Sequence, residues 1–360
     1  MDPSEWHVIG ESVRGSMHVR AQKPNQDAIA WYPDEGEGLP LILAVADGHG
    51  SDKHFRSDIG AQLATKTAVA VLREFSEHRP KDGELSLMME RLPAAIELQW
   101  KQAVRDHLDA NPVAEGTDEP AATISEHPAQ YIAYGTTLLS VLVEQDFIVY
   151  LQLGDGDILT VSPNGSVKRA IKSDPNLIAN QTTSLCLPEA RKYFHKQFQT
   201  IGTDPPALVM LSTDGYANSF EDSDFLKTGS DYLDLIRTEG IEHVNGHLKQ
   251  WLSETTAKGS GDDITVGIVI APPLEVAYKE QELQSQPEPE KPSNLGNEIH
   301  PGSSSLGDFA ETRVKLLMKL WRLIRLRRGA QLWLRRIIES QSSIPSTRCS
   351  SQCGEGRGQR

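Results

Sequence analysis

Short apolar runs bounded by polar turns recur through the first 271 residues and predict β-strands. Two runs, 135–144 and 147–154, are joined by Gln145-Asp146 and predict a hairpin. The run that begins at Asp157 contains its own Pro-Asn-Gly turn, which predicts a second strand reversal. Further strand-length runs lie at 41–46, 207–213 and 263–271.

Between these runs, apolar residues repeat at helical spacing. A helix is predicted over 57–78, where Ile59, Leu63 and Phe75 are among the residues that set the apolar period. A second is predicted over about 84–108, interrupted or restarted at Pro93, and helical segments fill about 222–257. The succession of long helices and hairpins favours an antiparallel α+β arrangement over a doubly wound parallel sheet.

The composition changes after Pro272-Pro273. Residues 279–307 are rich in Pro, Glu and Ser and nearly free of large apolar residues, which is typical of a linker. Beyond it, 313–328 reads as a basic amphipathic helix. We therefore predict four segments, namely a folded domain over 1–275, a disordered linker over 276–310, a basic amphipathic helical segment over 311–340 and a disordered tail over 341–360.

The basic segment has several possible partners. Lys315, Lys319 and Arg322 share one helical face, whereas Leu317 and Trp321 lie on another. Such a helix suits an anionic membrane, an acidic partner protein or the acidic domain of its own chain, and its arginines are otherwise simply solvated. We rank docking to a partner or to the chain itself slightly above membrane binding.

Charge is distributed unevenly along the chain, whose net charge is -14. Residues 311–360 carry 12 basic and 3 acidic side chains, whereas 1–310 carry 24 basic and 47 acidic ones. An acidic body argues against nucleic-acid binding, because phosphate contacts need a basic face. The first ten residues lack the pattern of a secretory signal, no apolar stretch is long enough to span a bilayer, and three cysteines are too few for a disulfide framework. We expect a cytoplasmic protein.

Aspartates stand in turns beside five of the apolar runs. These residues are Asp27, Asp47, Asp155, Asp214 and the pair Asp262-Asp263. One carboxylate at a strand end is commonplace, and each of these turns taken alone is no more than a turn; for Asp157 we favour that interpretation. Five such turns together indicate oxygen ligands gathered in one place, which suits Mg²⁺ or Mn²⁺ rather than zinc.

Six segments carry a resemblance to a known family. In chain order they read ESVRGSMHVRAQKPNQDA, VADGHG, YGTTLLSVLV, LQLGDGD, LSTDG and GSGDDITVGIVI. The ordered set resembles the type 2C, metal-dependent protein serine/threonine phosphatases, and most of all their prokaryotic branch, over about residues 7–271. The resemblance implies a four-layer α-β-β-α sandwich of two antiparallel sheets flanked by helices, with a metal site at one edge.

The resemblance also implies roles for individual residues. Asp47 matches the aspartate that bridges two metal ions, and the carbonyl of Gly48 matches a ligand of the second ion. Asp214 and Asp262 match ligands of the first ion, and Asp27 matches a residue that acts through metal-bound water.

Three further positions follow from the same comparison of motifs. His49 matches the proposed general acid for the leaving group. Asp263 stands where the family often has asparagine and keeps an oxygen ligand available. Asp155 matches a ligand of a weaker third ion, although Gly156-Asp157 follow it here where the family usually has Ser-Arg.

One departure concerns the substrate phosphate. Many members of the family hold it with an arginine five residues before the first-motif aspartate, and here that position is Gln22. Arg20, Lys23 and Arg14 are the candidates to replace it, and the sequence does not choose among them. An arginine fork positions a phosphate better than a lysine does.

The resemblance implies a phosphoprotein phosphatase that hydrolyses phosphoserine and phosphothreonine with a water bridged by two Mn²⁺ or Mg²⁺ ions. A cognate Ser/Thr kinase would be its counterpart. The sequence contains neither a GxSxG motif nor a CxxxxxR loop, which agrees with chemistry that needs no covalent nucleophile. Two alternatives stay open: a catalytically weak module that binds a phosphoprotein or kinase, and hydrolysis of a small phosphorylated metabolite.

Overall fold

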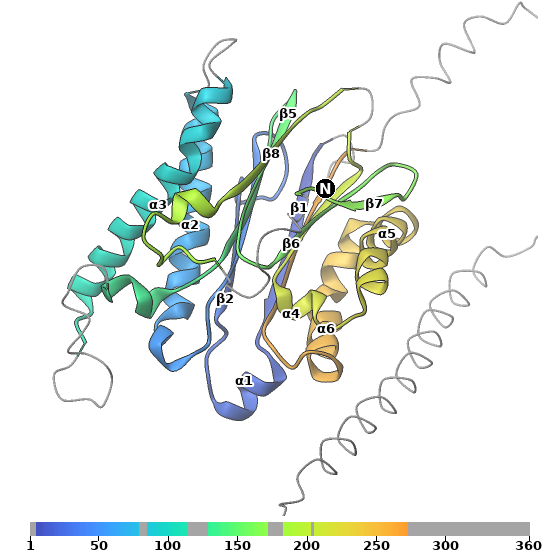
Figure 1. Cartoon of the computed structure of the whole chain (residues 1–360). Helices are drawn as coiled ribbons and strands as arrows, with labels where there is room; N and C mark the ends of the chain where they lie inside the picture. The colour runs from blue at the N-terminus through green and yellow to red at the C-terminus, as the bar shows by residue number, and fades with distance from the viewer. Residues whose placement is uncertain (1–4, 79–84, 114–128, 172–182, 203–204, 273–360) are drawn as a thin grey trace, which may run out of the picture. The chain divides into compact units, whose positions relative to one another are not determined.

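Two antiparallel sheets form the centre of the molecule in a computed structural model, which describes residues 5–78, 85–113, 129–171, 183–202 and 205–272 (Figure 1). The first sheet has the strand order β1 (His7–Val13), β10 (Ile264–Ile270), β9 (Leu208–Ser212), β6 (Asp157–Val161) and β7 (Val167–Arg169). The second has the order β2 (Asp27–Tyr32), β3 (Leu41–Asp47), β4 (Leu138–Val143), β5 (Phe147–Leu153) and β8 (His195–Thr200).

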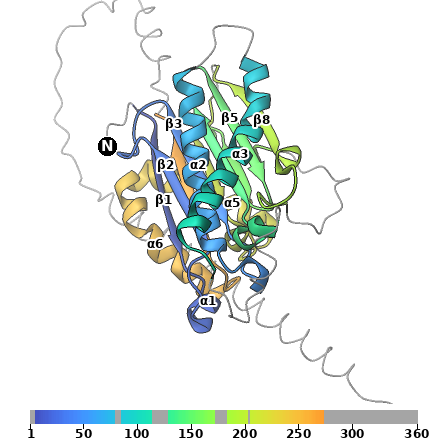
Figure 2. The same ribbon diagram turned by 90° about the vertical axis from the view of Figure 1, so that its left-hand side faces the viewer.

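Helices cover the outer face of each sheet. The helices α2 (Ser57–Glu77) and α3 (Leu85–Ala110) lie on the β2–β8 sheet, as Figure 2 shows. The helices α5 (Asp222–Glu239) and α6 (Ile241–Lys258) lie on the other sheet. This arrangement confirms the expected four-layer α-β-β-α sandwich. The shorter elements are α1 (Ser16–Ala21), α4 (Asp214–Ala217), and the 3-10 helices η1 (Asp52–His54), η3 (Ala129–Tyr134) and η4 (Ala190–Tyr193).

Strand β3 shows how the layers follow from the sequence. Its side chains alternate between the two faces of the sheet because the pleat has a period of two. Leu41, Leu43 and Val45 pack between the sheets, whereas Ile42 and Ala44 pack toward α2 and α3. Both faces are covered, so the strand is a continuous apolar run rather than an alternating one.

Several predicted elements are confirmed. β4 and β5 form the expected hairpin, with Val143 opposite Ile148, and β6 pairs with β7 around the predicted Pro-Asn-Gly turn. The helix predicted over 57–78 is α2, and the segments predicted over 222–257 are α5 and α6.

The interruption predicted at Pro93 is wrong, since α3 runs through it without a break. The missing amide and the bulk of the proline ring disfavour an interior position. Packing outweighs that cost here: Ile96, Trp100 and Val104 are buried against α2 and the sheet. The indole N–H of Trp100 also donates a hydrogen bond of 3.0 Å to the carbonyl of Gly60.

The predictions for the linker, the basic helical segment and the tail all fall on residues after 272. They lie outside the described residues, as does the boundary predicted at 275. Among the helices that the structure does describe, none combines the length and the apolar character that crossing a membrane requires.

Candidate metal centre

Strands of both sheets bring carboxylates to one edge of the sandwich. Asp27 begins β2, Asp47 ends β3, and the two are paired directly in the antiparallel register. The backbone N–H of Asp47 donates to the hydroxyl of Thr137 at 3.0 Å. Asp27 and Asp47 are thereby held side by side although 20 positions separate them.

The other sheet supplies three more of the predicted aspartates. Asp214 is the first residue of α4, directly after β9 and Thr213, and its Oδ2 accepts a 3.1 Å hydrogen bond from Asn218. Asp155 lies in the turn between β5 and β6, and Asp262 lies just before β10.

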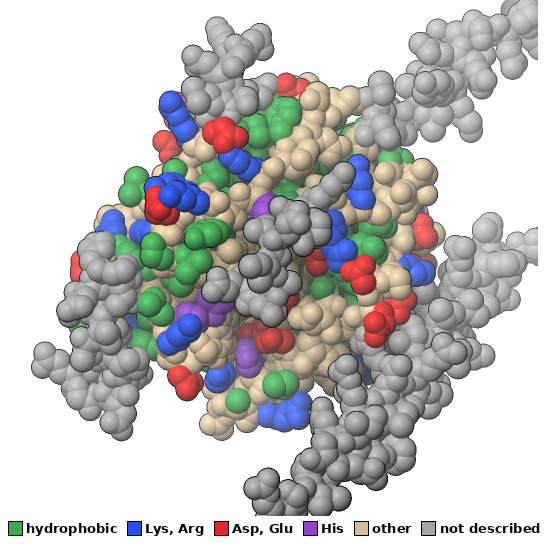
Figure 3. Space-filling view, viewed as in Figure 1, with side chains coloured by type: hydrophobic (Ala, Val, Ile, Leu, Met, Phe, Trp, Pro, Cys, Tyr) green, Lys and Arg blue, Asp and Glu red, His purple; other side chains and the backbone are tan. Residues whose placement is uncertain are grey.

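These residues surround a cavity of about 230 Å³. Figure 3 shows acidic and histidine side chains close together toward the lower end of the described surface. The cavity is lined by His18, Asp47, Gly48, His49, Gly50, Thr137, Asp155, Asp214, Asp262 and Asp263.

Asp27 is not part of that lining. It is buried behind the cavity, where its Oδ2 accepts hydrogen bonds from the hydroxyls of Thr213 at 2.9 Å and Thr265 at 2.8 Å. The expectation that Asp27 acts through water rather than by direct ligation is compatible with this position and stays a prediction.

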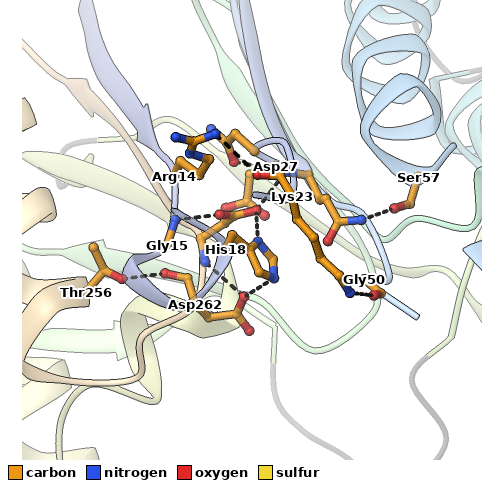
Figure 4. Close-up of polar contacts among 12 residues, drawn as sticks. Arg14, Gly15, His18, Lys23, Asp27, Gly50, Ser57, Thr256 and Asp262 are labelled. Atoms are coloured by element: carbon orange, nitrogen blue, oxygen red, sulfur yellow. Dashed lines mark hydrogen bonds and ion pairs between the residues drawn. The ribbon is translucent and has the colours of Figure 1, made fainter. Parts of the chain in front are cut away.

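Asp262 and Asp263 are neighbours in sequence with opposite surroundings. The side chain of Asp262 is 56% exposed, whereas that of Asp263 is 2% exposed. Asp263 accepts hydrogen bonds from the backbone N–H groups of Gly15 at 2.5 Å and Gln26 at 2.6 Å, and its Oδ2 lies 2.8 Å from Nδ1 of His18 (Figure 4). Asp263 thus connects both ends of the β1–β2 connection to the start of β10 through hydrogen bonds. That Asp263 is also a metal ligand stays a prediction.

Two motif glycines permit close approach of the backbone at this point. A Cβ on Gly215 would overlap the carbonyl oxygen of Asp263, and a Cβ on Gly15 would overlap the backbone of Asp262. Any larger residue would push the last aspartate pair away from α4 and from the β1–β2 connection. The glycines of these motifs therefore serve the packing of the segments that carry the carboxylates.

Burial and crowding disfavour the charged form of three of these carboxyl groups, Asp27, Asp47 and Asp214. Burial, followed by the nearby charges of Asp27 and Asp214, raises the pKa of Asp47 well above its usual range. Burial and then Asp263 raise the pKa of Asp27, while burial and then Asp155 raise that of Asp214. A divalent cation would reverse this penalty, so the site fits a hard cation such as Mg²⁺ or Mn²⁺. One ligand atom from each of His18, Asp262 and Asp263 also lies within 4.8 Å of the other two.

His49 lines the same cavity from the loop that follows β3. Its backbone N–H donates to the carbonyl of Gly135 at 3.1 Å, and its ring lies 4.8 Å from the ring of His54, centroid to centroid. Burial lowers the pKa of His49, and burial together with the neighbouring His49 lowers the pKa of His54 to about 4. His54 is therefore a neutral packing partner at physiological pH.

The three candidate phosphate-binding side chains lie outside the cavity lining. Arg14 donates to the carbonyl of Lys23 at 3.3 Å, and Lys23 donates to that of Gly50 at 2.8 Å (Figure 4). Arg20 donates to the carbonyl of Ser16 at 3.0 Å. Gln22 closes α1 as a left-handed C-cap with φ of 57°. Among the described residues that line the cavity, none is a lysine or an arginine.

Two other predicted positions can be placed. Asp157 starts β6 and pairs with Arg169 at 2.5 Å, which supports the structural interpretation that we favoured for it. His18 was not among the predicted site residues, yet it lies in the cavity wall. Its signal in the sequence was a histidine within the motif before Asp27, but neither spacing nor periodicity indicated the direction of its side chain.

The chain is similar to a described protein family and to several solved structures. A family model described as protein phosphatase 2C matches residues 14–253. The chain is similar to the solved structures of the Mycobacterium tuberculosis serine/threonine phosphatase PstP/Ppp (18% identity, 74% of this chain and 99% of that one, TM-score 0.45) and of the Staphylococcus aureus serine/threonine phosphatase Stp1 (15% identity, 73% and 94%, TM-score 0.48). It is also similar to a PstP catalytic domain in complex with two manganese ions (18% identity, 74% and 98%, TM-score 0.45). No curated protein sequence matches the chain.

Proposed function

The chain belongs to the protein phosphatase 2C family, and from this membership we propose that it is a metal-dependent phosphatase of phosphoserine and phosphothreonine in proteins. The observation that supports the proposal most is the convergence of carboxylates from separate segments on one cavity. Neither the fold nor the burial of a core requires five aspartates to line a single space. Binding of divalent cations would explain why these aspartates lie together.

We assign the ions to residues as follows. Asp47 would bridge two Mn²⁺ or Mg²⁺ ions, with Asp214 and Asp262 on the first and the carbonyl of Gly48 on the second. Asp155 would serve a weaker third ion. When bound, such a pair of ions activates a water for in-line attack on phosphorus and neutralises charge on the phosphate.

His49 would supply the proton that the departing serine or threonine oxygen needs. An alkoxide is a poor leaving group, so protonation during bond cleavage lowers the barrier. The side chain lines the cavity, and a backbone hydrogen bond fixes its loop. Burial lowers the pKa of His49 and so favours the neutral ring, while the charge of Asp155 acts in the opposite direction.

A phosphatase assay on the full chain tests the proposal. We expect hydrolysis of p-nitrophenyl phosphate and of a phosphothreonine peptide with Mn²⁺ or Mg²⁺, and loss of both activities with EDTA. Asp47→Asn and Asp214→Asn should each remove most of the activity. A fully active Asp47→Asn protein would refute the assignment.

A second candidate function is a regulatory module that binds a phosphoprotein or a kinase without rapid turnover. The lack of lysine and arginine in the described cavity lining favours it, since substrate phosphate would be weakly held. Absence of turnover on the peptide while metal is bound would support this alternative. A preference for a small phosphorylated metabolite over peptides would instead indicate that the substrates are small molecules rather than proteins.

The partners are proposed on sequence grounds. Phosphorylated proteins are the proposed substrates, with a Ser/Thr kinase as the counterpart and the basic C-terminal segment as a docking element. Comparison of full-length protein with residues 1–275 would test the segment: unchanged rates on phosphoprotein substrates, with unchanged affinity for them, would argue against a docking role.

A further inference from the structure

If the cavity binds a phosphate monoester, its negative charge exceeds the positive charge of two divalent ions. Five aspartates line it, and a phosphate monoester brings up to two more negative charges. Two divalent ions offset only part of that total. Hydrogen-bond donors from the chain are therefore needed, and the basic side chains in the described lining are His18 and His49.

The Nδ1 edge of His18 faces a buried carboxylate in the cavity wall, within ion-pair distance but without the geometry of a hydrogen bond. Nδ1 lies 2.8 Å from Oδ2 of Asp263, a carboxylate that is itself 2% exposed and fixed by the backbone N–H groups of Gly15 and Gln26. The ring is 17% exposed, and Nε2 lies 3.7 Å from Oδ1 of Asp262 (Figure 4). With Nδ1 turned toward the buried carboxylate, Nε2 is the nitrogen that faces a ligand.

The neighbouring arginine and lysine side chains form hydrogen bonds with backbone carbonyls outside the cavity lining. Arg14, Arg20 and Lys23 each donate to a backbone carbonyl of the β1–β2 connection or of the loop after β3. These contacts stabilise the two segments that frame the cavity. His18, on the same short helix as Arg20, is the member of this connection whose side chain lines the cavity.

We propose that His18 binds the substrate phosphate through Nε2–H, positioned by the buried carboxylate of Asp263. The inference rests on the proposed function and deepens it, because it assigns the group that holds the phosphate where Gln22 does not. A histidine beside Asp262 can also ligate a metal, but Mg²⁺ and Mn²⁺ prefer oxygen and the cavity already provides carboxylates. The phosphate has no comparable set of donors.

Calorimetric titration of the full chain tests this assignment. Wild type, His18→Ala, His18→Gln and His18→Arg are titrated first with Mn²⁺ and then, with Mn²⁺ bound, with inorganic phosphate. We expect His18→Ala to bind phosphate about tenfold more weakly, the effect of one charge-assisted hydrogen bond, while Mn²⁺ affinity stays within about twofold. His18→Arg should recover most of the phosphate affinity, and the KM for a phosphothreonine peptide should follow the same order.

Two controls make the result specific. His243→Ala removes an exposed histidine on α6 and should change neither titration. Asp263→Asn should weaken phosphate binding in the wild-type background but add no further loss to His18→Ala, because a positioning residue acts only through the ring that it holds. Thermal melting identifies any variant that fails to fold, and His18→Gln then replaces His18→Ala.

Three outcomes would overturn the inference. Unchanged phosphate affinity in His18→Ala would show that His18 does not bind the phosphate. A tenfold loss of Mn²⁺ affinity in the same variant would make His18 a metal ligand. If Asp263→Asn weakened phosphate binding further in the His18→Ala background, Asp263 would not act by positioning His18. A failure of the proposed function looks different. In that case wild type binds phosphate in a His18-dependent manner but hydrolyses no phosphoester.

Discussion

Individual carboxyl groups at the cavity differ in what surrounds them. Asp47 and Asp214 line the cavity, where burial and neighbouring carboxylates raise the pKa of each, whereas Asp27 lies behind it and accepts hydrogen bonds from two hydroxyls. Asp262 is open to solvent while Asp263 is enclosed by backbone donors. Substitutions of the same type should therefore have different effects at these positions.

Asp47→Asn is expected to weaken Mn²⁺ binding by at least about 100-fold, because the proposed bridging ligand would lose its charge. Calorimetric titration with Mn²⁺ measures the change. Asp234→Asn, on the exposed face of α5, is the matched control and should bind Mn²⁺ like wild type. Retention of wild-type affinity by Asp47→Asn would remove Asp47 from the ligand set.

The proton-donating role of His49 predicts a dependence on the leaving group. His49→Gln should reduce turnover of a phosphoserine peptide by about 10²–10⁴-fold, the typical contribution of general acid catalysis. It should affect p-nitrophenyl phosphate much less, since a nitrophenolate departs without a proton. Steady-state rates on both substrates test this, and an equal loss on both would assign His49 to binding or to the metal instead.

Short connections, rather than the long helices, determine the geometry of the site. The β1–β2 connection with α1, the first turn of α4 and the turn before β10 meet where Asp263 contacts Gly15 and Gly215. Each connection is anchored to the rigid end of a buried strand. Their mutual fit sets the distances among the carboxylates.

Gly215→Ala tests that fit. The added methyl would overlap the carbonyl of Asp263, so we expect a loss of about 1–3 kcal/mol in the free energy of unfolding and weaker Mn²⁺ binding. Gly246→Ala is the control, since a methyl there meets nothing within 4 Å and should stabilise α6 by about 0.5–1 kcal/mol. Denaturant unfolding measures both, and a Gly215→Ala protein as stable as wild type would contradict the packing argument.

At the scale of the whole molecule, the carboxyl groups of the site lower the stability of the folded state when no metal is bound. Asp27, Asp47 and Asp214 have raised pKa values in the folded chain, so at a pH between their usual and their raised values the folded state binds more protons than the unfolded state. Stability from this source falls as the pH rises through that window and stays low above it. Metal binding should restore it.

We therefore expect Mn²⁺ to raise the melting temperature more at pH 7.5 than at pH 5. In EDTA at pH 7.5, Asp47→Asn should melt above wild type, by about 2–4 °C for each kcal/mol of relieved repulsion, and the difference should shrink as the pH falls. Scanning calorimetry at both pH values, with and without Mn²⁺, measures these shifts. Equal melting temperatures of the two proteins in EDTA at every pH would contradict the argument.

The local pattern was sufficient for much of the fold. The continuous apolar run of β3, the hairpin of β4 and β5 and the apolar period of α2 depend on neighbouring residues, and the sequence displays those directly. The break predicted at Pro93 failed because the packing of Trp100 and its neighbours is a long-range effect that outweighs the local penalty.

The chain's own sequence determined which carboxylates stand at strand ends, their order and the type of cation that they suit, because residue identity and short-range period carry that information. Only the tertiary structure decided that Asp262 is open and Asp263 enclosed, that Arg14, Arg20 and Lys23 bind backbone carbonyls, and that His18 faces the cavity. The physical reason is distance along the chain. The contact of Asp263 with Gly15 joins residues 248 positions apart, and no local pattern specifies which atoms meet across such a separation.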